Sequence, residues 1–391
     1  MTENEPQSLE LRPVQNLSEI DRESWDALLG ASDNPFLRWD FLEGLERHGC
    51  AVPERGWYPC HLTAWNGDEL VIAVPAYLKN DGMGDFSRDW GFADLFRRAG
   101  ATMYPKLILG VPFSPVTGRR LLYRSDLEPA AAARAVMALA LELAKSNDLA
   151  SVHVLYHTPE EVSWWDSAGL APRTMIQYHW RNHGYETTDD WLARLKSKRR
   201  TQARRERREP QKQGIRIHTV RGDELAADPE GWADRAYDLY LTTCQKYMWG
   251  GAYLTRPFMK HLFRELPDAT ELVTASLDER IVAGAINIAS PTHLYGRYWG
   301  CHEEHRFLHF NVCLYHSIDE CIERGLDVFE GGAGGEHKMM RGFEPSLVHS
   351  SHWFAQRQIH ELLDDALRQD CRARQRELEH WQEESTQKGL G

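Results

Sequence analysis

A glycine-rich segment near the C-terminus carries side chains that could move a proton or hold an anion. A predicted strand at 326–330 leads into four glycines, and four polar residues follow: Glu336, His337, Lys338 and Arg341. Glycine lets backbone N–H groups approach a ligand closely. The spacing fits neither the GxxxxGK[ST] nor the GxGxxG pattern. We expect Glu336, or His337 in its place, to take a proton from an amine, and Lys338 and Arg341 to hold an anion. A purely structural loop is the alternative.

The most basic part of the chain is 194–208, which reads RLKSKRRTQARRERR and holds nine basic residues and one acidic residue. It stands in a chain whose 46 Lys and Arg against 58 Asp and Glu give a net charge of −12. The pattern predicts one helix over 190–209, closed by Pro210, with basic residues four apart on one face. Guanidinium groups suit phosphate oxygens. We expect phosphate contacts from Lys196, Arg199, Arg200 and Arg204, with a solvated helix face as the alternative.

The sequence offers no recognisable metal site or disulfide framework. His302 and His305 resemble a metal motif, but the second histidine comes one residue too early for HExxH. The seven cysteines are scattered and contain no CxxC pair, which is typical of reduced thiols in a cytoplasmic protein. We therefore expect no metal and no resident cofactor.

Further polar residues could face a substrate. Arg297 and Tyr298 lie in a predicted strand whose small and aromatic residues suit either a ligand-facing position or packing. Asn311, at the start of a predicted helix, could cap that helix or contact substrate. His352, on the last predicted strand, has the same ambiguity as His153, which alternates with valines and is expected to be a core histidine.

The composition is that of a folded globular protein. Hydrophobic residues make up 42% and charged residues 27%, which excludes a disordered or fibrous chain. A length of 391 residues exceeds one ordinary core and predicts two domains. The most apolar stretch, 130–144, is interrupted by Arg134 and Glu142, and a membrane span needs about 20 apolar residues. The polar, acidic start of the chain lacks the features of a secretory signal.

The periodicity of the chain predicts the same order of elements twice. The first part is expected to hold a helix at 18–29, a hairpin at 57–78, a rigid loop at 105–115, a helix at 128–146 and strands at 151–156 and 174–180. The second is expected to hold helices at 190–209, 231–248 and 256–266, a hairpin at 271–289, a strand at 293–301, a helix at 309–324 and strands at 326–330 and 350–354. We expect two mixed α/β units at 1–185 and 186–358, and a charged helical tail at 359–391.

These segments together resemble a bacterial family of N-acyltransferases called FemAB-like, or peptidoglycan biosynthesis/recognition, within the GNAT-like superfamily. The resemblance covers nearly the whole chain. It rests on Asn34-Pro-Phe-Leu, Trp57-Tyr-Pro-Cys-His-Leu, Val111-Pro-Phe-Ser-Pro-Val-Thr-Gly, Ser197-Lys-Arg-Arg, Leu294-Tyr-Gly-Arg-Tyr-Trp-Gly, Leu308-His-Phe, and most specifically Gly335-Glu-His-Lys with Arg341-Gly-Phe and His352-Trp. The chain departs from the family at Asn311, where a Glu is common, and Glu336 is the substitute if that carboxylate is the base.

The resemblance implies a tandem GNAT-like α/β (α+β) fold, two mixed-sheet units with flanking helices. It implies an N-acyltransferase in which an amine attacks an activated acyl carbonyl without a metal. Acyl-CoA is the expected donor, with acyl carrier protein and aminoacyl-tRNA as alternatives. The acceptor is expected to be an amine, for example a long-chain one such as a sphingoid base. In this scheme Glu336 or His337 is the base, substrate contacts come from Lys338, Arg341, Arg297, Tyr298, Asn311 and His352, and the basic helix holds donor phosphates.

A rival interpretation is a non-catalytic module that binds anionic lipid or nucleic acid. The acidic total charge argues against DNA as a partner. The expected location is the cytoplasm, with peripheral contact at the inner membrane as an alternative.

Overall fold

The computed structural model describes residues 9–246, 251–332 and 335–387, without the side chains of Glu336 and of 385–387. The chain divides into two compact units. Unit 1 comprises Met1–Met175 and Leu347–Arg376, and unit 2 comprises Ile176–Ser346 and Glu377–Gly391. The division therefore comes before the expected boundary at 185/186. Residues 347–376 belong to unit 1, because the second part of strand β15 (Glu344–Phe354) pairs there with β8 (Ser151–His157).

Unit 1 contains a four-stranded antiparallel sheet and a second, mixed set of strands. The first has the order β1–β3–β4–β7, and the second the order β15–β8–β6–β5–β2. Only the β6–β8 pair among these contacts is parallel. The further strands are β1 (Glu10–Val14), β2 (Trp57–Pro59), β3 (His61–Asn66), β4 (Glu69–Val74), β5 (Ala76–Lys79), β6 (Lys106–Leu109) and β7 (Leu122–Tyr123). The helices are α1 (Arg22–Asp26), α2 (Trp39–Arg47), α3 (Trp90–Arg98), α4 (Pro129–Ser146) and α5 (Glu161–Ser167).

Helix α4 organises the core of unit 1. The Glu128 side chain accepts hydrogen bonds from the first backbone amides, and Pro129 occupies the first turn, where its missing N–H costs nothing. The buried face of α4 packs against apolar residues of both strand sets, such as Leu62, Leu107 and Val152.

Residues 105–115, expected to be a rigid loop, contain an interior strand. β6 lies between β5 and β8, and all four of its residues are buried. The prolines at 105, 112 and 115 flank this strand and do not interrupt it. The prediction was wrong because it counted prolines over the whole segment and not within the four residues that pair.

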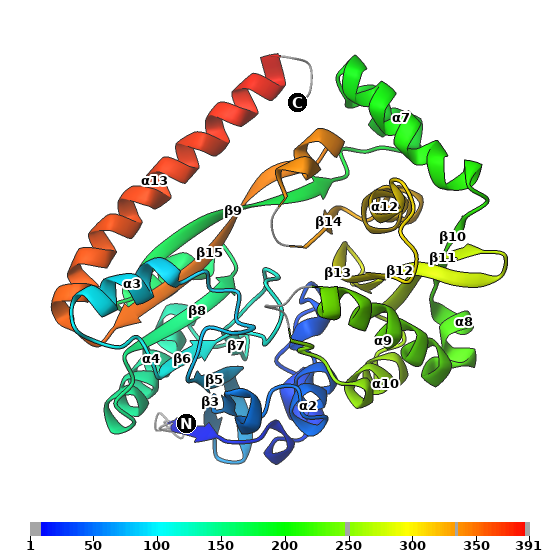
Figure 1. Cartoon of the computed structure of the whole chain (residues 1–391). Coiled ribbons are helices and arrows are strands. Elements are labelled where there is room, and N and C mark those ends of the chain that lie inside the picture. Colours follow the sequence, from blue (N-terminus) through cyan, green and yellow to red (C-terminus); the bar gives the residue numbers. More distant parts are fainter. Residues whose placement is uncertain (1–8, 247–250, 333–334, 388–391) are drawn as a thin grey trace, which may run out of the picture. The chain divides into compact units, whose positions relative to one another are not determined.

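Unit 2 is built around strands in the order β10–β11–β12–β13–β14–β9 (Figure 1). They are β10 (Arg216–Val220), β11 (Thr270–Leu277), β12 (Arg280–Ala289), β13 (His293–Cys301), β14 (Val328–Glu330) and β9 (Ala171–Arg181), which begins in unit 1. Helices α9 (Pro229–Lys246) and α10 (Arg256–Glu265) pack on each other, and α9 packs on β12 and β13 (Figure 1). The short helix α8 (Gly222–Ala227) precedes them, and the last part of α13 (Arg357–Gln387) also belongs to this unit.

Strands β13 and β14 pair over only three residues each. The pairing is parallel and ends at Tyr295 and Glu330. Beyond that point β13 continues to Cys301 while β14 gives way to the glycine-rich loop. The following helix, predicted over 309–324, consists of α11 (Leu308–Phe310), a π-helical turn (Asn311–Tyr315) and α12 (His316–Arg324). π-Helical turns are frequently found at functional sites.

The basic segment forms two helices and not one. Helix α6 (Thr188–Arg194) ends where Leu195 and Lys196 take extended backbone angles, and α7 (Ser197–Lys212) then begins. The interruption lets the Leu195 side chain enter the core of unit 2 beside Trp191. Pro210 lies inside the last turn of α7 and does not end it. In the described residues, no helix combines the length and apolar character needed to cross a membrane.

A buried group of histidines lies in unit 1. The Nδ1 atoms of His153 and His352 are 2.6 Å apart, and the His153 Nε2 atom lies 2.8 Å from Ser151 Oγ. Only one proton can lie between two Nδ1 atoms, so one ring must donate and the other accept. His157 Nε2 lies 2.9 Å from Ser351 Oγ. The three imidazoles are fully buried, and His352 is therefore not exposed for the substrate contact expected from the sequence.

We predict that acid destabilises the protein through these histidines. Burial lowers the pKa of His153 and of His157 to about 3, and that of His352 well below its ordinary value. The unfolded chain binds protons below about pH 6.5 while the folded chain does not. Above that pH these histidines do not lower the free energy of unfolding. As the pH drops below it, the free energy of unfolding falls by up to about 1.4 kcal/mol per pH unit for each imidazole.

Urea denaturation at pH 5.0 to 7.5 measures this dependence. His153→Gln should make the loss of stability with falling pH less steep than in the wild type, and the exposed His218 changed to Gln serves as the comparison variant. An identical slope for the wild type and His153→Gln would contradict the assignment.

Candidate active site in unit 2

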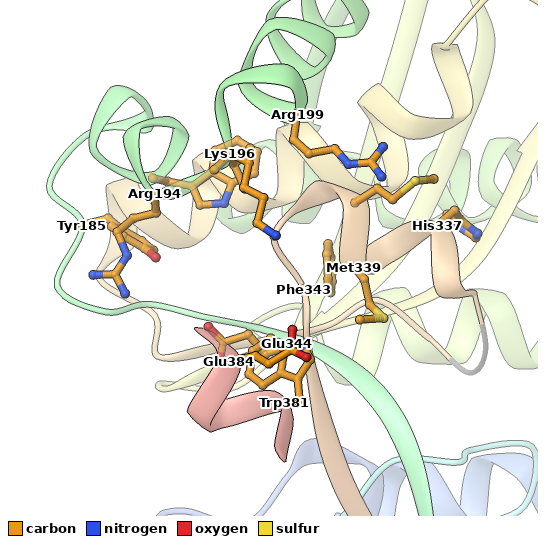
Figure 2. A pocket seen from close by; sticks show the side chains of 14 residues that line it. Tyr185, Arg194, Lys196, Arg199, His337, Met339, Phe343, Glu344, Trp381 and Glu384 are labelled. Atoms are coloured by element: carbon orange, nitrogen blue, oxygen red, sulfur yellow. The ribbon is translucent and has the colours of Figure 1, made fainter. Parts of the chain in front are cut away.

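A cavity of about 580 Å³ lies in unit 2, between α6, the start of α7, the segment around the 3-10 helix η5 (Glu336–Arg341) and the end of α13. Its apolar floor contains Trp191, Leu195, Met339, Met340 and Phe343. Figure 2 shows three cations on one side, Arg194, Lys196 and Arg199, and Glu344 and Glu384 across from them. His337 lies at one end of this lining (Figure 2).

The three cations reach the cavity because the chain breaks between α6 and α7. Arg194 is the last residue of α6, and Lys196 is the N-cap of α7. Arg199 follows in the first turn of α7 and hydrogen-bonds only weakly, at 3.4 Å, to Gln202 Oε1. In the described part of the chain none of the three forms an ion pair. They are therefore available to an anionic ligand.

Two other expected phosphate contacts have different roles. The Arg200 guanidinium donates to the carbonyls of Ala193 and Leu195 at 2.9 and 3.1 Å, and so closes the end of α6. Arg204 pairs with Asp189 at 3.2 Å. The structure thus brings Lys196 and Arg199 to the cavity and leaves Arg200 and Arg204 outside its lining. Arg194 was missed, because only the break in the helix turns it inward.

A buried ion pair fixes η5 to α7. The carboxylate atom Glu206 Oε2 accepts hydrogen bonds from Arg341 Nε and Nη2 at 3.1 and 2.9 Å, and from the Tyr315 hydroxyl at 2.7 Å. The Arg341 guanidinium also lies over the Phe310 ring, 3.5 Å from its centroid. Its Nη1 atom donates to the His337 carbonyl at 2.9 Å. Arg341 was expected to hold an anionic substrate, but its charge is used by Glu206.

Lys338 is also turned inward. Only 4% of the residue is exposed, and its Nζ atom donates to the Gly332 carbonyl at 2.5 Å. Burial lowers its pKa to about 8. The lysine thus closes the glycine-rich loop and does not present its charge at the surface. The Glu336 side chain lies outside the described residues.

His337 remains accessible at the edge of the cavity. Its ring is tilted against Phe310, with centroids 5.7 Å apart. Burial, followed by the positive charges of Arg341 and Lys338, lowers the pKa of His337 below its ordinary value. A neutral imidazole at this position is able to accept a proton or a hydrogen bond.

The remaining expected contacts are packing or capping residues in this structure. Arg297 lies over the Tyr298 ring, and Tyr298 packs edge-on against Tyr240, with ring centroids 5.1 Å apart. Neither lines the cavity. The Asn311 amide donates to the carbonyls of Glu206 and Phe307, both at 2.9 Å. Of the two roles open to Asn311, the geometry supports the structural one.

A sequence comparison identifies the family. The model of the FemAB-like family, described as peptidoglycan biosynthesis/recognition, matches residues 16–388. The chain belongs to the FemAB-like family. No curated protein matches the sequence.

Solved structures share the fold of this FemAB-like chain. The crystal structure of FemX aligns with a TM-score of 0.51 and 11% identity, over 88% of this chain and 98% of FemX. The C-terminal domain of a putative lysylphosphatidylglycerol synthetase from Agrobacterium fabrum aligns with a TM-score of 0.52 and 11% identity, over 90% and 96%. A tandem GNAT protein from the clavulanic acid biosynthesis pathway aligns with a TM-score of 0.47 and 14% identity, over 89% and 99%. The expected fold class, with mixed-sheet units and flanking helices, is confirmed.

We predict that the Glu206–Arg341 pair is essential to the stability of unit 2. Glu206→Gln should lower the free energy of unfolding by about 3–5 kcal/mol, because it leaves the Arg341 charge buried without a counter-charge. The double variant Glu206→Leu with Arg341→Met removes both charges. Its loss of unfolding free energy should therefore be smaller than the sum of the losses for Glu206→Leu and Arg341→Met measured singly.

Chemical denaturation followed by tryptophan fluorescence measures these differences. Glu209→Gln, on the same helix, is the matched control, and should change stability by no more than about 0.5 kcal/mol. Strict additivity of the two single changes would show that the pair is not coupled.

Proposed function

We propose that this FemAB-like protein is an N-acyltransferase, which moves an acyl or aminoacyl group from a phosphate-bearing donor to an amine. The observation that carries the proposal is the cavity in unit 2, where Arg194, Lys196 and Arg199 have no ion-pair partner in the described residues and face an apolar floor. That combination suits a donor with phosphates at one end and an apolar group at the other.

Acyl-CoA is the donor that this lining fits best. Its phosphates require a small group of cations, and its acyl chain requires apolar surface such as that of Met339, Met340 and Phe343. One structural neighbour is a putative lysylphosphatidylglycerol synthetase, which favours aminoacyl transfer as the alternative reaction and a lipid as a candidate acceptor. Aminoacyl-tRNA is the alternative donor to be tested. A long-chain amine such as a sphingoid base is the acceptor that we propose, with acyl carrier protein as another donor to be tested.

The chemistry joins the amine nitrogen to the acyl carbonyl carbon and releases the thiol or alcohol of the donor. It requires a group that takes a proton from the nitrogen. Glu336 was proposed from the sequence, with His337 as its alternate. His337 lies at the cavity edge, held by the contact of its carbonyl with Arg341.

The direct test offers the purified protein a panel of acyl-CoAs, acyl carrier protein and charged tRNA, each with long-chain and short amines. Thiol release and mass spectrometry of the products report transfer. We expect an amide product from at least one acyl-CoA. Binding of donors with no transfer from any of them would favour the non-catalytic binding module.

We predict that the cavity cations set the affinity for the donor. Lys196→Ala and Arg199→Ala should each raise the KM for the donor by about tenfold, which corresponds to about 1.4 kcal/mol of charge-assisted contact, with little change in kcat. The combined variant should also weaken the dependence of KM on salt.

Lys198→Ala is the matched control, because this exposed lysine lies on the same helix but does not line the cavity. Initial rates at several salt concentrations give the KM for the donor of each variant and its dependence on salt. Equal effects of Lys198→Ala and Lys196→Ala would show that the helix attracts the donor only through its total charge.

A further inference from the structure

A strip of partly exposed rings lies beside η5 in unit 2. Trp299 of β13 packs edge-on against His309, with centroids 5.1 Å apart. His309 in turn contacts Phe310 at 5.5 Å, and Phe310 contacts His337 at 5.7 Å. The imidazoles of His309 and His337 therefore both contact the Phe310 ring, but of these two histidines only His337 lines the cavity.

The position of His309 is set by the backbone that carries it and not by hydrogen bonds of its own ring. It lies in the single α-helical turn at 308–310, held by Asn311, whose amide bonds to the Phe307 and Glu206 carbonyls. The side chain of His309 is exposed. Within the described residues neither of its ring nitrogens has a hydrogen-bond partner. A lone pair of this ring is thus open to an incoming molecule.

The surroundings of His309 keep its ring neutral. Although the residue is exposed, desolvation of its ring lowers the pKa of His309 to about 4, and the positive charges of Arg341 and Lys338 on η5, with that of His337 whenever it is protonated, act in the same direction. The ring is therefore unprotonated at neutral pH. The approach to it lies along β13, which has no partner on the β14 side beyond Tyr295 among the described residues.

We infer that His309 is a further catalytic residue, which accepts the proton of the amine during acyl transfer. The inference rests on the proposed function. In this proposal the phosphate end of the donor occupies the cavity and its acyl carbonyl extends past His337 to the Phe310 ring. The acceptor amine approaches along β13, so that its nitrogen meets this carbonyl within reach of His309. Trp299 and Phe310 provide apolar surface for the chain of the amine.

The step balances without any further reactant. The neutral amine attacks the acyl carbon, a C–N bond forms, and the nitrogen becomes positively charged. Its proton is then much more acidic than that of a free ammonium ion, so even a weakly basic imidazole can remove it. His309 takes this proton, the C–S or C–O bond of the donor breaks, and the proton passes to the departing sulfur or oxygen. The products are an amide and a thiol or alcohol, with His309 neutral again.

The experiment compares wild type, His309→Ala and His302→Ala with the donor and amine that the wild type uses. His302 is the matched control, because it is an exposed histidine of the preceding loop and no described residue is bonded to its side chain. We expect His309→Ala to lower kcat by about 100-fold or more, with the donor KM changed less than about threefold. Added imidazole should restore kcat in proportion to its concentration, since it can enter the exposed position left by the ring.

The outcomes separate the inference from the proposed function. Rescue by imidazole in His309→Ala, with none in His302→Ala, supports the proton role, and an unchanged melting temperature of His309→Gln shows that the fold is intact. A kcat for His309→Ala within threefold of wild type overturns the inference while the proposed function stands, and so does a lost kcat that imidazole does not restore. A wild type that transfers no acyl group overturns both.

Discussion

The ion pair between Glu206 and Arg341 holds the candidate site together. Both side chains are almost fully enclosed, 2% and 4% exposed, and a buried charge is tolerated only when it is paired and hydrogen-bonded. Glu206 is the single acidic residue of the basic run 194–208. Its side chain points inward. It accepts hydrogen bonds from Arg341 of η5 and from Tyr315 of the π-helical turn, and so joins α7 to both elements. The helix that supplies the cavity cations is thereby joined to the loop that supplies His337.

The charge run on α7 serves two purposes once its partners are known. Several arginines stabilise the unit itself: Arg200 bonds to carbonyls at the end of α6, and Arg207 pairs with Asp319 at 2.7 Å. The cations at the break between the helices are left to a ligand. The repulsion of so many like charges is thus reduced within the fold, and the remaining positive charge is concentrated at one cavity. A chain with a net charge of −12 can therefore still present a positively charged cavity, as the proposed anionic donor requires.

Local pattern predicted much of the architecture and the approximate location of the site. Hairpins, the Ala/Leu-rich α4 and the glycine-rich loop could be predicted because their signals lie within short windows. The orientation of Lys338 and Arg341 could not, since the partner of Arg341 lies 135 residues earlier. The break at Leu195 was also invisible, because it arises from packing against Trp191. The pairing of β15 with β8 in unit 1 depends on a contact between distant parts of the chain.

Lys338 and Arg341, which the sequence suggested as ligand contacts, are buried, and their charges act on neighbouring residues from inside the fold. Neither is free to bind substrate, yet both lie close enough to His309 and His337 to disfavour protonation of these rings, in addition to the effect of burial. A lysine bonded to a carbonyl and an arginine bonded to a carboxylate are fixed charges that substrate binding does not displace. The imidazoles beside them are therefore ready to accept a proton before any substrate arrives. The proposed acyl transfer needs a proton acceptor that is still unprotonated when the amine attacks, and in this proposal the buried cations provide that condition without touching the amine.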